Sequence, residues 1–245
     1  MSRVILVTGS NAGIGYHMVQ QIAAKDKDYV VYLSARSEEK GKEATATLAK
    51  EGLTNVKFVL LDVTDPKTIA SAKETIEQAE GKLDVLVNNA GNGFFDREQD
   101  PRIADIDAIR EAFELNLIGL IQTTTAFLPL LRKGEHPVIL NVSTDMASQD
   151  YLVNLPACRL HCVAYNTSKA AANSYTISLS KMETGVKVNS VTPGYTATKL
   201  NGFGKYGGGF RTAEDGAAML VPWALLDKDG PTGKFIWFDG TEHAW

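Results

Sequence analysis

A glycine-rich turn stands between a short apolar run and a helical pattern at the start of the chain. The apolar run is Val4–Val7; Gly9, Gly13 and Gly15 follow it, and apolar residues at helical spacing begin at Ile14. An apolar run that ends in a turn favours a buried strand of a parallel sheet. Glycines let the backbone approach a ligand, and a helix N-terminus offers free N–H groups and a positive dipole end. The arrangement predicts a phosphate cradle; a plain tight turn is the alternative.

Further short apolar runs alternate with helical patterns along the chain. The runs are Tyr29–Ala35, Val56–Leu61, Val85–Val87, Val138–Val142, Val186–Val191 and Phe235–Phe238. The expected helices include Glu38–Glu51, Ile103–Leu131 and Ala213–Leu226. No linker or repeat divides the 245 residues. We therefore predict an α/β fold, a single Rossmann-type domain over residues 1–245 with a doubly wound parallel sheet of about seven strands flanked by helices.

Composition and charge argue against several classes of protein. The net charge is −4, so no basic surface indicates a nucleic acid partner. No run of about 18 apolar residues suggests a membrane span, and the first apolar run is too short for a signal peptide. The four histidines are scattered without metal-ligand spacing. We expect a cytoplasmic protein with no metal, nucleic acid or membrane partner.

Arg36 follows the second apolar run, where an NAD-preferring site usually carries an acidic residue for the ribose hydroxyls. A guanidinium there suits the 2′-phosphate of NADP(H), and Ser37 adds a hydroxyl donor. The alternative is a solvated arginine at the start of a charged helix. We interpret Arg36 as a phosphate ligand, which favours NADP(H) as the cofactor.

Tyr165 and Lys169 lie four residues apart in a stretch rich in alanine that favours a helix. This spacing places both side chains on one helix face, one turn apart. A nearby ammonium lowers the pKa of a phenol from about 10 and makes it a proton donor usable near neutral pH. An exposed pair on an amphipathic helix is the alternative, because a lone pattern of this kind is common by chance.

Four motifs occur in the order in which they stand in the short-chain dehydrogenase/reductase family, and the chain resembles that family over essentially its whole length. They are Thr8-Gly9-x3-Gly13-Ile14-Gly15, Asn88-Asn89-Ala90-Gly91, Tyr165-x3-Lys169 and Pro193-Gly194. The chain is similar to the carbonyl reductase branch in Ala35-Arg36, Met146, Glu214–Ala217 and the tail Gly230–Trp245. The resemblance implies an NADPH-dependent oxidoreductase that reduces ketones and aldehydes to alcohols by hydride transfer.

The resemblance also implies roles for particular residues, with Tyr165 as general acid, Lys169 on the nicotinamide ribose and Asn116 supporting a relay water. The catalytic set is Asn116, Ser143, Thr144, Tyr165 and Lys169. The cofactor set is Gly9, Ser10, Asn11, Gly13, Ile14, Gly15, Arg36, Ser37, Asp62, Val63, Asn89, Ala90, Gly91, Tyr165, Lys169, Pro193, Gly194, Thr196 and Thr198. The expected substrate pocket is Met146, Tyr151, Leu152, Tyr195, Phe203 and Phe210, and segment 195–212 is either a lid or a surface loop.

Some positions depart from the family pattern. Thr144 stands in place of the catalytic serine, which leaves Ser143 as a second candidate for the hydroxyl. The segment between Thr144 and Tyr165 is longer than usual, so monomer and homo-oligomer both remain open. Ala12 stands where many NADP-dependent members carry a basic residue. The alternatives to a reductase are an NADP-dependent secondary-alcohol dehydrogenase and a non-catalytic dinucleotide-binding regulator.

Overall fold

The computed structural model describes residues 2–156, 160–204 and 211–245. The described residues form a seven-stranded parallel sheet in the order β3-β2-β1-β4-β5-β6-β7. The strands are β1 Val4–Val7, β2 Val30–Ala35, β3 Val56–Leu60, β4 Val85–Asn88, β5 Val138–Val142, β6 Lys187–Val191 and β7 Phe235–Ile236. The order reverses between β1 and β4, as in doubly wound folds. The predicted single-domain Rossmann-type fold is confirmed.

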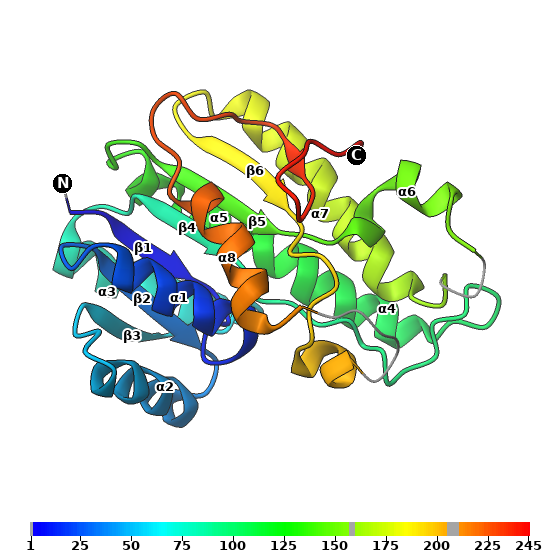
Figure 1. Ribbon diagram of the computed structural model, residues 1–245, viewed down its shortest axis with the longest axis horizontal. Helices are drawn as coiled ribbons and strands as arrows, with labels where there is room; N and C mark the ends of the chain where they lie inside the picture. The colour runs from blue at the N-terminus through cyan, green and yellow to red at the C-terminus, as the bar shows by residue number, and fades with distance from the viewer. Residues whose placement is uncertain (1, 157–159, 205–210) are drawn as a thin grey trace.

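Helices cover both faces of this sheet (Figure 1). On one face lie α1 Gly13–Lys25, α2 Glu38–Lys50 and α8 Ala213–Ala224, and on the other lie α3 Pro66–Glu80, α5 Gly119–Leu131 and α7 Val163–Met182. The remaining described segments are α4 Ile106–Phe113, the π-helix η1 Glu114–Ile118, the 3-10 helix η2 Asp145–Ala147, α6 Gln149–Val153 and η4 Lys199–Gly204.

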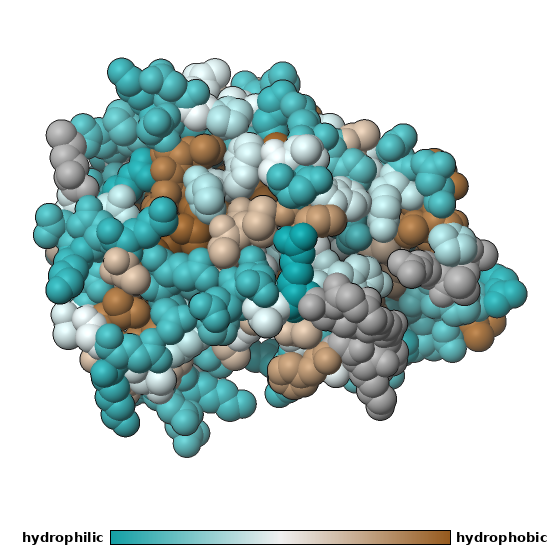
Figure 2. Space-filling view, viewed as in Figure 1, coloured by the Kyte–Doolittle hydropathy of each residue, from teal (hydrophilic) through white to brown (hydrophobic). Residues whose placement is uncertain are grey.

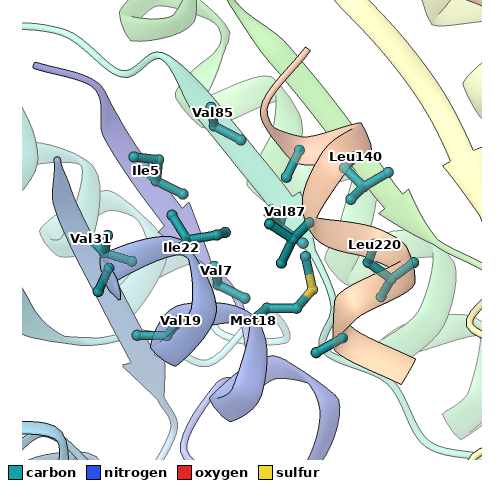
Figure 3. Close-up of a cluster of buried hydrophobic side chains, with 14 of the residues drawn as sticks. Ile5, Val7, Met18, Val19, Ile22, Val31, Val85, Val87, Leu140 and Leu220 are labelled. Atoms are coloured by element: carbon teal, nitrogen blue, oxygen red, sulfur yellow. The ribbon is translucent and has the colours of Figure 1, made fainter. Parts of the chain in front are cut away.

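Strand β1 is apolar throughout because its successive side chains enter opposite layers of the core. Ile5 and Val7 of β1 pack toward α1 and α8, as Figure 3 shows, whereas Leu6 belongs to the cluster on the other face. All three side chains are fully buried. Each such burial contributes about 1.5–3 kcal/mol relative to exposure. The unbroken apolar runs in the sequence thus reflect a sheet covered on both sides.

The structure differs from the predicted elements in three places. The long helix begins at Ile106, because Asp105 caps it by accepting hydrogen bonds from the N–H groups of the first turn, and η1 interrupts it. Two short helical segments that were not among the predicted elements, η2 and α6, follow β5. The last strand ends at Ile236, since Trp237 N–H donates to Thr241 O in a turn.

The continuous helical stretch Ile106–Leu131 is long and apolar enough to cross a membrane by length and composition alone, with a mean hydropathy of 1.2. Within the protein, 44% of its most apolar window is buried. Phe127, Leu130 and Leu131 of α5 belong to the core cluster beneath the sheet. Packing against the sheet therefore accounts for the apolar residues at the end of this stretch.

Candidate active site

All strands of the sheet point toward the end of the molecule that carries α4, α6 and η4 (Figure 1). In Figure 2 the molecular surface is indented at the lower edge of the view, beside the atoms of η4. The turns that follow β1, β2, β4, β5 and β6 meet at this end because parallel strands share a carboxyl edge. Open α/β sheets bind ligands at that edge, where the strand order reverses.

The glycine turn after β1 is packed against the end of β4. Gly9 has a φ of +59°, and a Cβ atom there would lie 3.0 Å from the Cα atom of Ala90. A Cβ atom on Gly15 would lie 2.4 Å from Nδ2 of Asn89. Thr8 Oγ1 accepts hydrogen bonds from the N–H groups of Asn89 (2.9 Å) and Ala90 (3.0 Å). The turn therefore requires glycine at these positions whether or not a ligand binds.

The first turn of α1 fits a dinucleotide pyrophosphate. Ala12 occupies the N-cap position without a side-chain hydrogen bond, and no acidic residue stands in the first turn. Gly13 has a φ of +61°, and its Cβ position lies 3.8 Å from Cγ2 of Thr198 in the loop after β6. N–H groups that no side chain caps, together with the positive helix end, favour a bound anion. Ile14 and the partly buried Asn11 border the same turn.

Ser10 is placed differently from the sequence-based expectation. It is fully buried, its N–H donates to Ser34 O (2.8 Å), and its hydroxyl donates to Val7 O (2.7 Å). The same hydroxyl oxygen accepts a hydrogen bond from Ser34 N–H (2.9 Å). Ser10 thus joins the turn to β2, and its hydroxyl does not face a ligand. A hydroxyl at this buried position satisfies backbone groups that would otherwise lack partners.

Arg36 and Ser37 fit the 2′-phosphate of an NADP-type dinucleotide. Arg36 is exposed at the end of β2 and forms no ion pair or hydrogen bond with other described residues. Ser37 caps α2 by accepting a hydrogen bond from Lys40 N–H (3.4 Å), which leaves its own hydroxyl proton to donate. At the end of β3, Asp62 Oδ1 accepts from Thr64, and Val63 is buried against Gly119.

Asn116 lies in the π-helix η1 and links the loop after β4 to α7. Its Nδ2 donates to Asn92 O (2.9 Å) and to Ser168 Oγ (3.0 Å), and its Oδ1 accepts from Asn92 N–H (3.0 Å). A Cβ atom on Gly91 would lie 3.0 Å from Asn116 Oδ1 and 3.3 Å from Lys169 Nζ. The glycine therefore keeps the space in front of both polar groups free. Single π-turns inside helices occur frequently at functional sites.

Lys169 is buried, with 5% of its surface exposed, and its Nζ donates to Val142 O (2.9 Å) at the end of β5. Burial lowers the pKa of this ammonium from 10.5 to about 8. Lys169 lies one turn from Tyr165 on α7, as predicted from their spacing.

The pKa of Tyr165 departs from the sequence-based expectation. Burial raises the pKa of the phenol above its ordinary value of 10.0, and the Asp145 carboxylate raises it further. A hydrogen bond with Thr144 acts in the opposite direction. The expected lowering by Lys169 is not found, because that ammonium is directed to a backbone carbonyl, while the charge with the largest effect on the phenol is the negative one of Asp145.

Ser143 and Thr144, the two candidate hydroxyls, point to different places. Ser143 Oγ donates to Asn173 Oδ1 on α7 (2.8 Å), away from the phenol. Thr144 forms the hydrogen bond with Tyr165, and its hydroxyl donates to Asp145 Oδ1 (2.8 Å). The structure therefore brings Thr144, and not Ser143, to the proton donor.

The loop after β6 closes the other side of the site. Gly194 has a φ of +71°, and a Cβ atom there would lie 2.9 Å from the ring of Phe238. Thr196 is buried, and its hydroxyl donates within the loop to Pro193 O and Gly194 O. Thr198 is the member of this loop that reaches the glycine turn. Pro193 to Thr198 thus lie at the expected edge, with the Thr196 hydroxyl already engaged.

The expected substrate pocket is brought together only in part. Met146 follows Thr144 and Asp145 in η2, and Tyr151 and Leu152 lie on α6. The Tyr151 ring packs edge-on against Trp237, with centroids 5.2 Å apart. Tyr195 is 47% exposed and Phe203 is 73% exposed, so the expectation that Phe203 forms a pocket wall is not met. Phe210 and residues 205–209 of the expected lid lie outside the described residues.

Gln99 and Phe95 contact Tyr165 although sequence reasoning missed them. Gln99 Oε1 accepts from Ala164 N–H (3.1 Å) and Tyr165 N–H (3.2 Å), and its Nε2 donates to Gly93 O and Phe94 O. The Phe95 ring meets the Tyr165 ring edge-on, with centroids 5.3 Å apart. A hint in the sequence is that no Ser, Thr, Asp or Asn precedes α7, so its first N–H groups need a cap from elsewhere.

The fold and this site define a dinucleotide-binding oxidoreductase, and comparisons with known proteins show the family. A family profile described as short chain dehydrogenase matches residues 3–204. The chain belongs to the short-chain dehydrogenase family, as its motifs predicted. Salutaridine reductase from Papaver bracteatum is 32% identical, with 95% of this chain and 93% of that protein covered. (+)-Neomenthol dehydrogenase from Arabidopsis thaliana is also 32% identical, with 96% and 95% covered.

Solved structures agree with this assignment. The structure of salutaridine reductase from Papaver somniferum has a TM-score of 0.83 at 30% identity and covers 97% of this chain and 99% of that chain. NADPH-bound carbonyl reductase from chicken fatty liver has a TM-score of 0.84 at 26% identity, with 100% and 99% covered. Both similarities extend over 97% or more of this chain.

Proposed function

We propose that the protein is an NADPH-dependent reductase that converts ketones or aldehydes to alcohols, in the manner of a carbonyl reductase. This proposal rests on one arrangement at the carboxyl edge of the sheet, beside the glycine turn that follows β1. It consists of Thr144, Tyr165, Lys169 and Asn116. Similarity to an NADPH-bound carbonyl reductase and to plant reductases supports it. A small-molecule carbonyl compound is the proposed partner.

The cofactor is held by groups of the site that have no partner among the described residues or that border its open space. The first turn of α1, with Gly13, takes the pyrophosphate, and Arg36 with Ser37 takes the 2′-phosphate. Ala90 and Gly91 border the adenosine and ribose, and Lys169 holds the nicotinamide ribose. The guanidinium after β2, which is exposed and has no partner among the described residues, is the reason to prefer NADP(H) over NAD(H).

The chemistry follows from the groups around Tyr165. NADPH supplies the hydride when bound, and the protein supplies orientation and the proton. The Tyr165 phenol holds the proton for the carbonyl oxygen, and the Thr144 hydroxyl, which donates to Asp145 Oδ1 in the free protein, turns to donate to that oxygen when the substrate binds. Lys169 and Asn116 border the space beside Gly91, through which the phenol can be reprotonated by water. The buried Lys169 ammonium and the buried Asn116 amide favour the negative charge that develops on the oxygen atom.

The direct test is turnover of aldehydes and ketones followed at the nicotinamide absorbance, with NADPH and NADH compared. We expect NADPH-dependent reduction that Tyr165→Phe lowers by about 10²–10⁴-fold, with NADPH affinity nearly unchanged. Oxidation of secondary alcohols without appreciable reduction of ketones would favour the dehydrogenase alternative. NADPH binding without turnover of any substrate would favour a regulator.

A further inference from the structure

Asp145 is a buried carboxylate beside the proposed proton donor, and the reaction as described does not use it. It directly follows Thr144 and is 7% exposed. Its Oδ1 accepts hydrogen bonds from Thr144 Oγ1 (2.8 Å) and from Met146 N–H (3.0 Å). Its Oδ2 has no hydrogen bond to the described residues and is not among their enclosed, unpartnered polar atoms, so it borders open space.

No cation balances this carboxylate within the part of the chain that the structure describes. None of the ion pairs among these residues includes Asp145. The Lys169 ammonium donates its hydrogen bond to Val142 O and not to Asp145. Burial lowers the pKa of His243, although nearby carboxylates, Asp145 among them, act in the opposite direction. A carboxylate with 7% of its surface exposed and no counter-charge favours a cation at its open oxygen. Asp145 therefore places a negative charge next to Tyr165 that no described residue neutralises.

The local turn does not require a carboxylate. Thr144 already caps η2, because its Oγ1 accepts a hydrogen bond from Met146 N–H (3.3 Å). An asparagine at position 145 has a carbonyl oxygen that can accept the same two hydrogen bonds. Only the negative charge distinguishes aspartate here, and that charge acts on the site by raising the pKa values of Tyr165 and Cys162.

We propose that Asp145 selects the substrate, and that the carbonyl compound reduced at this site carries a positively charged amine. The ammonium group pairs with Asp145 Oδ2 while the carbonyl oxygen lies between Thr144 and Tyr165. The rings of Phe95 and Tyr165 supply the apolar contact for the rest of such a molecule. This inference rests on the proposed function, since it names the substrate class of the same site.

The bound cation would also act on the proton donor. Pairing with Asp145 offsets the negative field that holds the Tyr165 proton tightly. Binding energy and proton transfer would then both depend on the same charge of the substrate. A neutral ketone of equal shape leaves the carboxylate unpaired and is expected to react more slowly.

The test uses two ketones of nearly equal shape, para-(dimethylaminomethyl)acetophenone, which is protonated at neutral pH, and para-isobutylacetophenone. The ratio of their kcat/KM values with NADPH is measured for the wild type, Asp145→Asn and Asp150→Asn. Asp150 is an exposed carboxylate on α6 and serves as the matched control. We expect the wild type to favour the cationic ketone and Asp145→Asn to lower the ratio by about tenfold or more. Asp150→Asn should leave the ratio unchanged.

The outcomes separate this inference from the proposed function. If the wild type reduces neither these ketones nor a wider panel, the proposed function fails. If it reduces both and Asp145→Asn leaves the ratio as in the wild type, the proposed function stands and the inference is wrong. An equal change for both ketones would also overturn it, since Asp145 would then act on the phenol or the cofactor alone. NADPH affinity and the melting temperature verify that the variant is folded.

Discussion

At the scale of single residues, the site is governed by where hydroxyl groups and charges point. Thr144 shares its hydroxyl between Tyr165 and Asp145, whereas Ser143 donates to Asn173. The extra methyl group of threonine restricts its χ1 rotamers, and the hydrogen bonds select the one that faces the phenol. Neighbouring residues with the same functional group thus have different tasks.

The first prediction at this scale compares the two hydroxyl residues. Thr144→Ala removes the hydroxyl beside Tyr165, and we expect a loss of kcat of about 10²-fold or more. Ser143→Ala breaks only a hydrogen bond to α7, so its main effect should be a loss of stability of about 1 kcal/mol. Steady-state kinetics and urea unfolding of both variants measure the two effects. The reverse ranking of kcat would identify Ser143 as the catalytic hydroxyl.

The second prediction concerns the exposed guanidinium after β2. Arg36→Asp replaces a phosphate donor by a repelling charge, and we expect a loss of about 1.5–3 kcal/mol in NADPH binding, enough to cancel or invert the preference over NADH. Lys40→Asp, an exposed charge on the adjoining helix, is the control and should keep most of the preference. Fluorescence titration with both cofactors gives the affinities. An Arg36→Asp protein that discriminates as the wild type does would exclude a phosphate role.

At the scale of elements, the start of α7 depends on a side chain from a distant loop. Cys162 stands at the N-cap position but gives no side-chain hydrogen bond. The four side-chain hydrogen bonds of Gln99 instead join the first turn of α7 to the loop around Phe94. These hydrogen bonds anchor the N-terminal end of α7 to the loop after β4. They thereby help to fix the position of Tyr165, which lies in the first turn of α7.

We predict that Gln99→Leu lowers both stability and turnover. It removes the hydrogen-bond partner of the Ala164 and Tyr165 N–H groups and of Gly93 O, which should cost about 2–4 kcal/mol, whereas Phe94 O still accepts from Arg97 N–H. The kcat should fall while the KM for NADPH changes little, because Gln99 contacts the helix and not the glycine turn. Gln149→Leu, an exposed glutamine on α6, is the control and should change neither. A Gln99→Leu protein with wild-type kcat would show that α7 is positioned by its packing alone.

At the scale of the whole molecule, the site carries a cost in stability. Lys169 is buried and forms no ion pair with the residues that the structure describes, and its pKa falls from 10.5 to about 8 on folding. The unfolded chain therefore binds more protons than the native protein between these two values, so stability rises with pH across that window. Below pH 8 both states are protonated and the full cost is present.

The corresponding prediction uses Lys169→Met, which keeps the length of the side chain and removes the charge. The difference in unfolding free energy, wild type minus variant, should increase by up to about 3 kcal/mol as the pH rises from 8 toward 10.5. Urea unfolding at several pH values measures it. The variant should also lose turnover at every pH. A pH-independent difference would mean that Lys169 titrates alike in both states.

Periodicity, the glycine turn and the motifs at strand ends were sufficient to predict the fold, the family and the edge that carries the site. These features are local, since apolar spacing and turn residues act on neighbours in the chain. The tertiary structure decided what depends on contacts between distant segments: the burial of Ser10 under β2, the exposure of Phe203, and the cap that Gln99 places on α7. The charge that acts on Tyr165 belongs to the same class, because it comes from Asp145 across the site and the spacing of Tyr165 and Lys169 could not reveal it.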